Sequence, residues 1–184
     1  MTTHKILGLS GSLRANSFNS KLLAQAAHHY PDAEYTAGDL RLPLYDGDIE
    51  AAEGIPAEVR KLADQIAQAD AVVIATPEYN KAISGVLKNA LDWISRADGG
   101  AANSPLKGKP VAILSATAGR SGGERAQAML RLCLQPFLPN LLQGPEVLVA
   151  ETHNQFDDEH QLTGDLNLET LKGLMAALKA EVEG

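Results

Sequence analysis

The sequence predicts an α/β fold, in which helices cover both faces of a parallel β-sheet. Short apolar runs that suit buried strands alternate along the chain with segments whose apolar residues recur at helical spacing. No stretch has the composition of a linker between domains, and 184 residues suit one domain with a substantial core. We therefore expect residues 1–184 to form a single domain.

Residues 70–75 give the clearest strand signal, because a continuous apolar and β-branched run is typical of a central parallel strand buried on both faces. Five segments are expected to form strands: 4–9, 33–40, 70–75, 110–115 and 146–150. Five segments are expected to form helices: 19–29, 56–69, 84–95, 124–138 and 164–182. The segment 41–54 contains Pro43, Gly47 and several acidic residues, and it is expected to be a loop.

These elements make five βα units, and a strand order of 2-1-3-4-5 would give them a switch in winding direction beside strand one. Ligands of such sheets bind beyond the carboxyl ends of the strands at that switch point. The loops after strands one, three and four would meet there, and they are the loops richest in small and polar residues. Any binding site is therefore expected at these three loops.

The first loop, residues 10–19, combines three serines, a glycine, an arginine and two asparagines between a strand and a helix. Hydroxyl groups and free backbone N–H groups at a helix N-terminus form a ready anion site. The loop has neither the glycine pattern of a dinucleotide site nor that of a P-loop, so a single phosphate group suits it better. Ser12, Ser17 and Asn19 are the expected phosphate ligands, with Arg14 at the rim. A turn that merely caps the helix is the alternative.

The second and third loops, residues 76–80 and 115–123, could receive a flat ligand. Pro77 restricts the backbone of the second loop, and Tyr79 could cover one face of a ring. The small residues of the third loop would let its backbone come close to such a ring. The alternatives are an ordinary turn with a half-exposed tyrosine and a flexible connection.

The three loops also carry a family resemblance. Gly11-Ser12-Leu13-Arg14-x-x-Ser17-x-Asn19 resembles the phosphate loop of the NADPH-dependent FMN reductase family, which includes chromate and quinone reductases and some azoreductases. Residues 76–80 together with 84–93 resemble its second signature. Residues 122–131 followed by 145–147 resemble its fourth βα unit.

The resemblance implies a flavodoxin-like three-layer sandwich that binds FMN, with a five-stranded parallel sheet in the order 2-1-3-4-5. It implies NADPH or NADH as electron donor and a homodimer or homotetramer. The residues implied around the FMN phosphate are Ser10, Ser12, Arg14, Ser17 and Asn19. Those implied along the isoalloxazine are Pro77, Glu78, Tyr79 and Asn80, the last three through backbone groups. Ser115, Gly119 and Arg120 would complete the pocket.

The implied activity is an NAD(P)H oxidoreductase that passes electrons from FMN to quinones, azo compounds, free flavin or metal oxyanions such as chromate. Because the flavin itself accepts and delivers the electrons, no catalytic side chain is expected. A flavodoxin-type electron carrier without its own nicotinamide reaction is the alternative. A scaffold that has lost its cofactor is a third possibility, against which the intact polar first loop argues.

Composition excludes several other classes. A net charge of −7 argues against nucleic-acid binding, and no apolar run approaches the roughly 20 residues of a membrane span. The only cysteine, Cys133, excludes an intrachain disulfide and favours a cytoplasmic protein; it is expected to be a buried, inert thiol. His153 and His160 lie among acidic residues, but their spacing fits no metal site, so none is expected.

Overall fold

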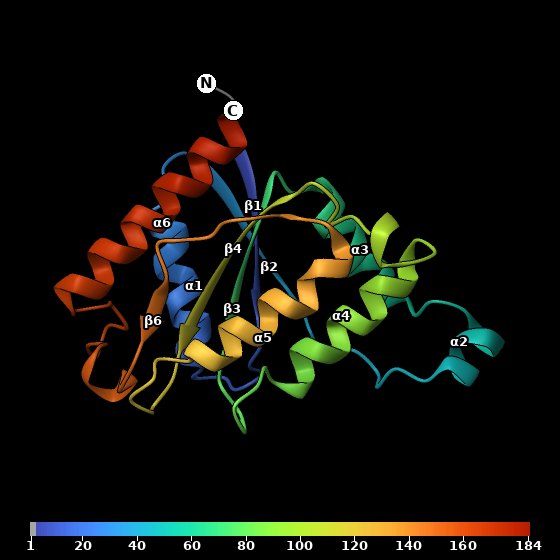
Figure 1. Ribbon diagram of the computed structural model, residues 1–184, viewed down its shortest axis with the longest axis horizontal. Helices are drawn as coiled ribbons and strands as arrows, with labels where there is room; N and C mark the ends of the chain where they lie inside the picture. The colour runs from blue at the N-terminus through green and yellow to red at the C-terminus, as the bar shows by residue number, and fades with distance from the viewer. Residues whose placement is uncertain (1–2) are drawn as a thin grey trace.

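The computed structural model describes residues 3–184 and contains a parallel sheet between two layers of helices (Figure 1). The order β2-β1-β3-β4-β5 confirms the predicted topology, and β6 also pairs with β4. The strands are β1 (His4–Ser10), β2 (Ala33–Gly38), β3 (Ala71–Thr76), β4 (Pro110–Ala116), β5 (Asn140–Leu141) and β6 (Val147–Val149).

Two helices cover one face of the sheet and three cover the other, which confirms the three-layer prediction (Figure 1). The first layer contains α1 (Phe18–His28) and α6 (Asp165–Glu183). The second contains α3 (Ala57–Gln68), α4 (Gly85–Ala97) and α5 (Glu124–Leu134). Each layer forms its own apolar core against the sheet.

Strand β3 explains how one apolar run serves both cores. All six of its residues are buried. Val72 and Ile74 pack into the core under α3, α4 and α5, while Val73 and Ala75 pack under α1 and α6. Successive side chains of a strand point to opposite faces, so a strand covered on both sides must be apolar throughout.

Two local predictions were wrong. The helix expected over 124–138 ends as α5 at Leu134 and is followed by an unpredicted short strand, β5, whereas the expected fifth strand, 146–150, is present as β6; both strands pair with β4. The expected loop 41–54 contains a short helix, α2 (Gly47–Glu53), whose N-cap Asp46 accepts a hydrogen bond from the Asp48 backbone N–H at 2.8 Å.

Helix α2 buries none of its residues and projects from the body of the molecule (Figure 1). Side chains of α4 hold its approach segment: Trp93 Nε1 and Asn89 Nδ2 both donate to the Pro43 carbonyl, at 2.8 and 2.9 Å. Glu50 of α2 accepts a hydrogen bond from Arg96 Nε at 3.0 Å, and this pair lowers the pKa of the Glu50 carboxyl. No helix within residues 3–184 is long and apolar enough to cross a membrane.

Candidate functional site

A cavity of about 320 Å³ lies where the loops after β1, β3 and β4 meet, at the carboxyl end of the sheet. Its volume is in the range of small-molecule sites, about 300–1,000 Å³. The first loop contributes Ser12, Arg14, Ser17, Phe18 and Asn19. The second contributes Pro77, Glu78 and Tyr79, and the third contributes residues 116–119 and Ser121. The convergence expected from the strand order is therefore present.

The N-terminus of α1 faces this cavity. Ser17 caps the helix, since its Oγ accepts a hydrogen bond from the Ser20 backbone N–H at 3.3 Å, and within residues 3–184 it donates none. The first turn has no acidic residue, so the positive end of the helix dipole is not compensated there. The cap and the anion site, two readings of the same loop in the sequence, are thus compatible with each other.

Asn19 lies at the cavity, but its amide is occupied by the backbone of β4. Its Nδ2 donates to the Ala116 carbonyl at 2.9 Å, and its Oδ1 accepts from the Ala116 N–H at 3.0 Å. The side chain is buried. Asn19 therefore fastens the start of α1 to the end of β4, which differs from the direct phosphate contact that the sequence suggested.

Ser10 lies outside this cavity, on the far side of the first loop. Its Oγ accepts a hydrogen bond from Ser20 Oγ at 3.0 Å and donates to the Ser12 carbonyl at 3.2 Å. Ser10 instead lines a neighbouring cavity. The first loop itself is fixed at Gly11, whose N–H donates to Ala75 O at 2.8 Å and whose carbonyl accepts from Ser84 Oγ at 2.6 Å.

The second loop makes a tight turn after Glu78. Tyr79 and Ala82 exchange both backbone hydrogen bonds at 3.0 Å, and Asn80 and Lys81 between them have positive φ angles. Tyr79 is 50 % exposed at the edge of the cavity, as a residue that could cover a ring face should be. Asn80 sits at the tip of the turn and does not line the cavity.

Glu78 connects the second loop to α5. Its carboxylate accepts hydrogen bonds from the backbone N–H groups of Arg125 and Ala126, at 3.2 and 3.4 Å, and pairs with Arg125 Nη1 at 3.2 Å. Its side chain is only 12 % exposed. The N-cap position of α5 is Gly123, which has no side chain to offer, so Glu78 supplies the cap from another loop.

Replacing Glu78 with alanine is expected to lower the free energy of unfolding by about 1–2 kcal/mol, because the first N–H groups of α5 lose their acceptor. Urea unfolding followed by circular dichroism measures the loss. Arg125→Ala is the matched control, since it removes only an exposed ion pair worth about 0–1 kcal/mol. Equal losses in the two variants would contradict the capping role of Glu78.

The third loop lies against the cavity through its backbone and small side chains. Gly119 lines the cavity, whereas Ser115 and Arg120 do not. Ser115 is fully buried beneath the loop, where its Oγ donates to Gly122 O at 2.6 Å and accepts from Gln127 Nε2 at 2.9 Å. It therefore shapes the loop from behind.

Two lining residues were not anticipated from the sequence, Phe18 and Thr152. Thr152 belongs to the turn after β6, and its N–H donates to the Thr117 carbonyl at 3.2 Å. Nothing in the local sequence around Thr152 connects it with the third loop. Phe18 follows the cap residue of α1, and its position within the first loop was the available signal.

The remaining candidates lie away from the cavity. Cys133 is half-buried on α5, and burial raises the pKa of its thiol, which favours the unreactive neutral form. His153 and His160 do not line the cavity. Within residues 3–184, no group of three or more histidine, cysteine or acidic side chains is placed to hold a metal ion.

Known proteins resemble this chain over nearly its whole length. It is 42 % identical to an NAD(P)H-dependent FMN reductase of Pseudomonas aeruginosa over 177 residues, covering 95 % of this chain and 93 % of that protein. It is 38 % identical to a quinone reductase of Escherichia coli over 180 residues, covering 94 % and 92 %.

A solved structure agrees with these relatives. FerB, a flavoenzyme NAD(P)H:(acceptor) oxidoreductase from Paracoccus denitrificans, superimposes with a TM-score of 0.85 at 30 % identity, covering 98 % of this chain and 97 % of that one. Residues 4–154 match the family described as NADPH-dependent FMN reductase, and they contain all three cavity loops. The chain therefore belongs to the NADPH-dependent FMN reductase family.

Proposed function

We propose that the protein is an oxidoreductase that holds FMN in the cavity of the three loops, reduces it with NADH or NADPH, and passes the electrons to a small acceptor. The observation that carries the proposal is the meeting of three features at one cavity: the uncompensated N-terminus of α1, the hydroxyl-rich first loop and the exposed ring of Tyr79. Quinones, azo compounds, free flavin and oxyanions such as chromate are the proposed acceptors, in keeping with the named relatives.

The residues divide into two groups along the cavity. Ser12, Ser17 and the first N–H groups of α1 would bind the phosphate, with Arg14 beside them. The loops after β3 and β4 would hold the flavin ring, with Pro77 and Tyr79 on one side and the backbone of residues 116–119 on the other. The bound flavin supplies hydride acceptance and electron transfer. The side chains position it and leave an open face, beside half-exposed Tyr79, to donor and acceptor.

The test begins with the visible absorbance of purified protein after incubation with FMN and removal of unbound flavin. We expect stoichiometric flavin, and anaerobic stopped-flow mixing with NADH or NADPH should bleach it within the turnover time. Protein that stays colourless would refute FMN binding. Bound flavin that neither nucleotide reduces would instead identify an electron carrier.

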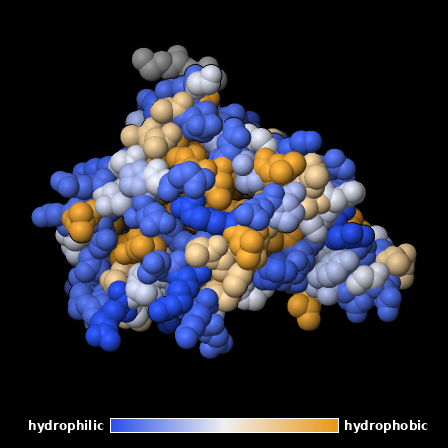
Figure 2. Space-filling view, in the orientation of Figure 1, coloured by the Kyte–Doolittle hydropathy of each residue, from blue (hydrophilic) through white to orange (hydrophobic). Residues whose placement is uncertain are grey.

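We also propose that residues 1–184 act as one domain, in the cytoplasm, as a homodimer or homotetramer. The chain's single cysteine supports the compartment, because disulfide frameworks belong to oxidising ones. Leu44, Leu132 and Leu138 are each more than half exposed, which supports an association surface. Figure 2 shows such apolar residues over α5 and beside the segment leading to α2, on a face that is otherwise largely hydrophilic. Sedimentation velocity measures the assembly.

A further inference from the structure

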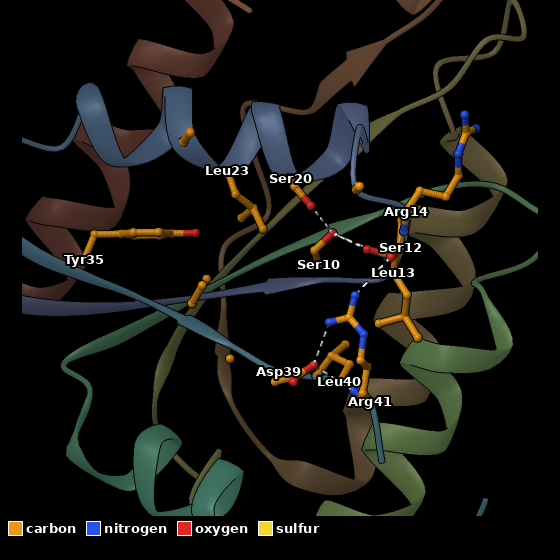
Figure 3. A pocket seen from close by; sticks show the side chains of 15 residues that line it. Ser10, Ser12, Leu13, Arg14, Ser20, Leu23, Tyr35, Asp39, Leu40 and Arg41 are labelled. Carbon is orange, nitrogen blue, oxygen red and sulfur yellow. Dashed lines mark hydrogen bonds and ion pairs between the residues drawn. The ribbon is translucent and has the colours of Figure 1, made fainter. Parts of the chain in front are cut away.

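A second cavity, of about 450 Å³, lies on the other side of the first loop, between α1 and β2 (Figure 3). Ser12 and Arg14 line both cavities, so the two are neighbours across one strip of chain. The second cavity combines apolar walls, such as Leu23 and Leu40, with polar groups at its mouth. Apart from Ser12 and Arg14, no residue of the proposed FMN site lines it.

Tyr35 forms part of this cavity and points its hydroxyl inward (Figure 3). The ring can lie there only because β1 has a glycine beneath it: a Cβ on Gly8 would overlap the Tyr35 hydroxyl. Within residues 3–184 this hydroxyl makes no hydrogen bond to another side chain or to the backbone. Burial raises the pKa of Tyr35 to about 12, so the hydroxyl stays protonated and can donate a hydrogen bond to a ligand.

Asp39 and Arg41 stand at the mouth, directly after the end of β2 (Figure 3). Asp39 Oδ1 accepts from the Arg41 N–H at 3.0 Å and from Arg41 Nη1 at 3.2 Å. Arg41 Nη2 donates to the Leu13 carbonyl at 3.2 Å, which brings the guanidinium to the first loop. Asp39 Oδ2 accepts no hydrogen bond within residues 3–184, and both side chains are well exposed.

The position of this pair in the topology suggests its ligand. In dinucleotide-binding α/β sheets, an acidic residue about 20 residues after the first turn, near the end of the second strand, binds the adenosine ribose hydroxyls. A nearby arginine accommodates a 2′-phosphate there. Here Asp39 and Arg41 occupy the corresponding end of β2, with the second cavity between them and α1. An apolar wall with a few hydroxyl groups suits an adenine base.

Arg14 lies at the boundary between the two cavities. It is exposed, it lines both, and it forms no ion pair with any residue in the range 3–184. NADH or NADPH could bind with its nicotinamide at the flavin and its adenosine in the second cavity. Its pyrophosphate would then lie over the first loop, beside Arg14. A free guanidinium is suited to that charge.

We infer that the second cavity holds the adenosine end of the nicotinamide donor, with Asp39 accepting hydrogen bonds from the ribose hydroxyls and Arg41 contacting the 2′-phosphate of NADPH. The inference rests on the proposed function and identifies the donor part of that site. It makes the two residues act in opposite directions: Asp39 favours NADH and repels a 2′-phosphate, whereas Arg41 favours NADPH.

Two substitutions test these opposite effects. Asp39→Asn is expected to lower kcat/KM for NADH about tenfold and to leave that for NADPH unchanged or raised, because the charge-assisted hydrogen bond is lost and the repulsion is removed. Arg41→Ala is expected to lower kcat/KM for NADPH about tenfold and to change that for NADH less than about twofold. Asp98→Asn and Arg60→Ala are the matched controls, since that exposed pair carries the same charges and lines neither cavity.

Direct binding gives a second readout. FMN-loaded protein is titrated in a calorimeter with 5′-AMP and with adenosine 2′,5′-bisphosphate, while the flavin absorbance is followed. Both are expected to bind without releasing flavin, with Asp39→Asn weakening 5′-AMP and Arg41→Ala weakening the bisphosphate. No binding, release of flavin by the nucleotide, or equal effects of both variants on both donors would overturn the inference. Failure to load FMN would refute the proposed function instead, so the two failures are distinguishable.

Discussion

Replacing Ser12 with aspartate is expected to weaken FMN binding by at least about 100-fold while the fold is retained. Ser12 lines the cavity beside the N-terminus of α1 and is partly exposed, so an aspartate fits sterically but places a negative charge next to the phosphate. Two unit charges about 4 Å apart repel by about 4 kcal/mol near a protein surface, and solvent reduces this toward the roughly 2.7 kcal/mol of a 100-fold change. Fluorescence titration of flavin-free protein with FMN measures the affinity.

Two variants control this experiment. Asn16→Asp places the same charge in the same loop at a residue that lines neither cavity, and it should weaken binding far less. Ser12→Ala removes one hydroxyl and should weaken the free energy of FMN binding by about 0.5–1.5 kcal/mol. Unchanged affinity in Ser12→Asp would remove Ser12 from the site, and an equal loss in Asn16→Asp would mean that overall charge is responsible.

Trp93→Ala is expected to be the most destabilising single change, lowering the free energy of unfolding by about 3–5 kcal/mol. Trp93 of α4 is fully buried and belongs to the core formed with α3 and α5. It also packs edge-to-face against Tyr45, with ring centroids 5.0 Å apart, and donates to the Pro43 carbonyl. Its loss leaves a cavity in the larger core and loosens the segment leading to α2. Chemical denaturation gives the value from the midpoint and slope.

Trp93→Phe separates packing from hydrogen bonding. The ring is largely preserved, and Asn89 Nδ2 still donates to the Pro43 carbonyl, so the expected loss is well below that of the alanine variant. If the two substitutions cost the same, the hydrogen bond would outweigh the packing and our account of this core would be wrong.

The fold was predictable because the apolar runs report burial directly. Strand β3 is buried on both faces in the structure, and its run in the sequence has no polar interruption before Thr76. The strand order then placed the three loops together. The short strand β5 and the helix α2 were not predicted, because contacts with residues distant in the sequence help to hold both. Helix α2, for example, is held by Arg96 of α4.

The candidate site was predictable in its loops but less so in its side chains. Ser12, Ser17, Pro77 and Tyr79 line the cavity, as expected of residues in those loops. Asn19 and Ser115 have the same polar character, yet the Asn19 amide is taken by the Ala116 backbone and the Ser115 hydroxyl by the Gly122 carbonyl and the Gln127 side chain. Composition shows that a polar group is available, and only tertiary structure shows which partner it has. Thr152 was missed for the same reason, since β6 brings it to the third loop.

Hydrogen bonds link the three cavity loops, or the helices that follow them, to one another. Ser84, the N-cap of α4, holds Gly11 of the first loop, Glu78 of the second loop caps α5, and Asn19 of α1 holds the end of β4. Each of these hydrogen bonds joins a side chain on one segment to the backbone of another, so together they hold the three loops against one another. A ligand that enters meets walls already in place, and little conformational entropy is lost when it binds. A preformed site of this kind favours a cofactor that stays bound through many turnovers. The electron donor and acceptor, which exchange in each cycle, would bind and leave at the exposed edge beside Tyr79.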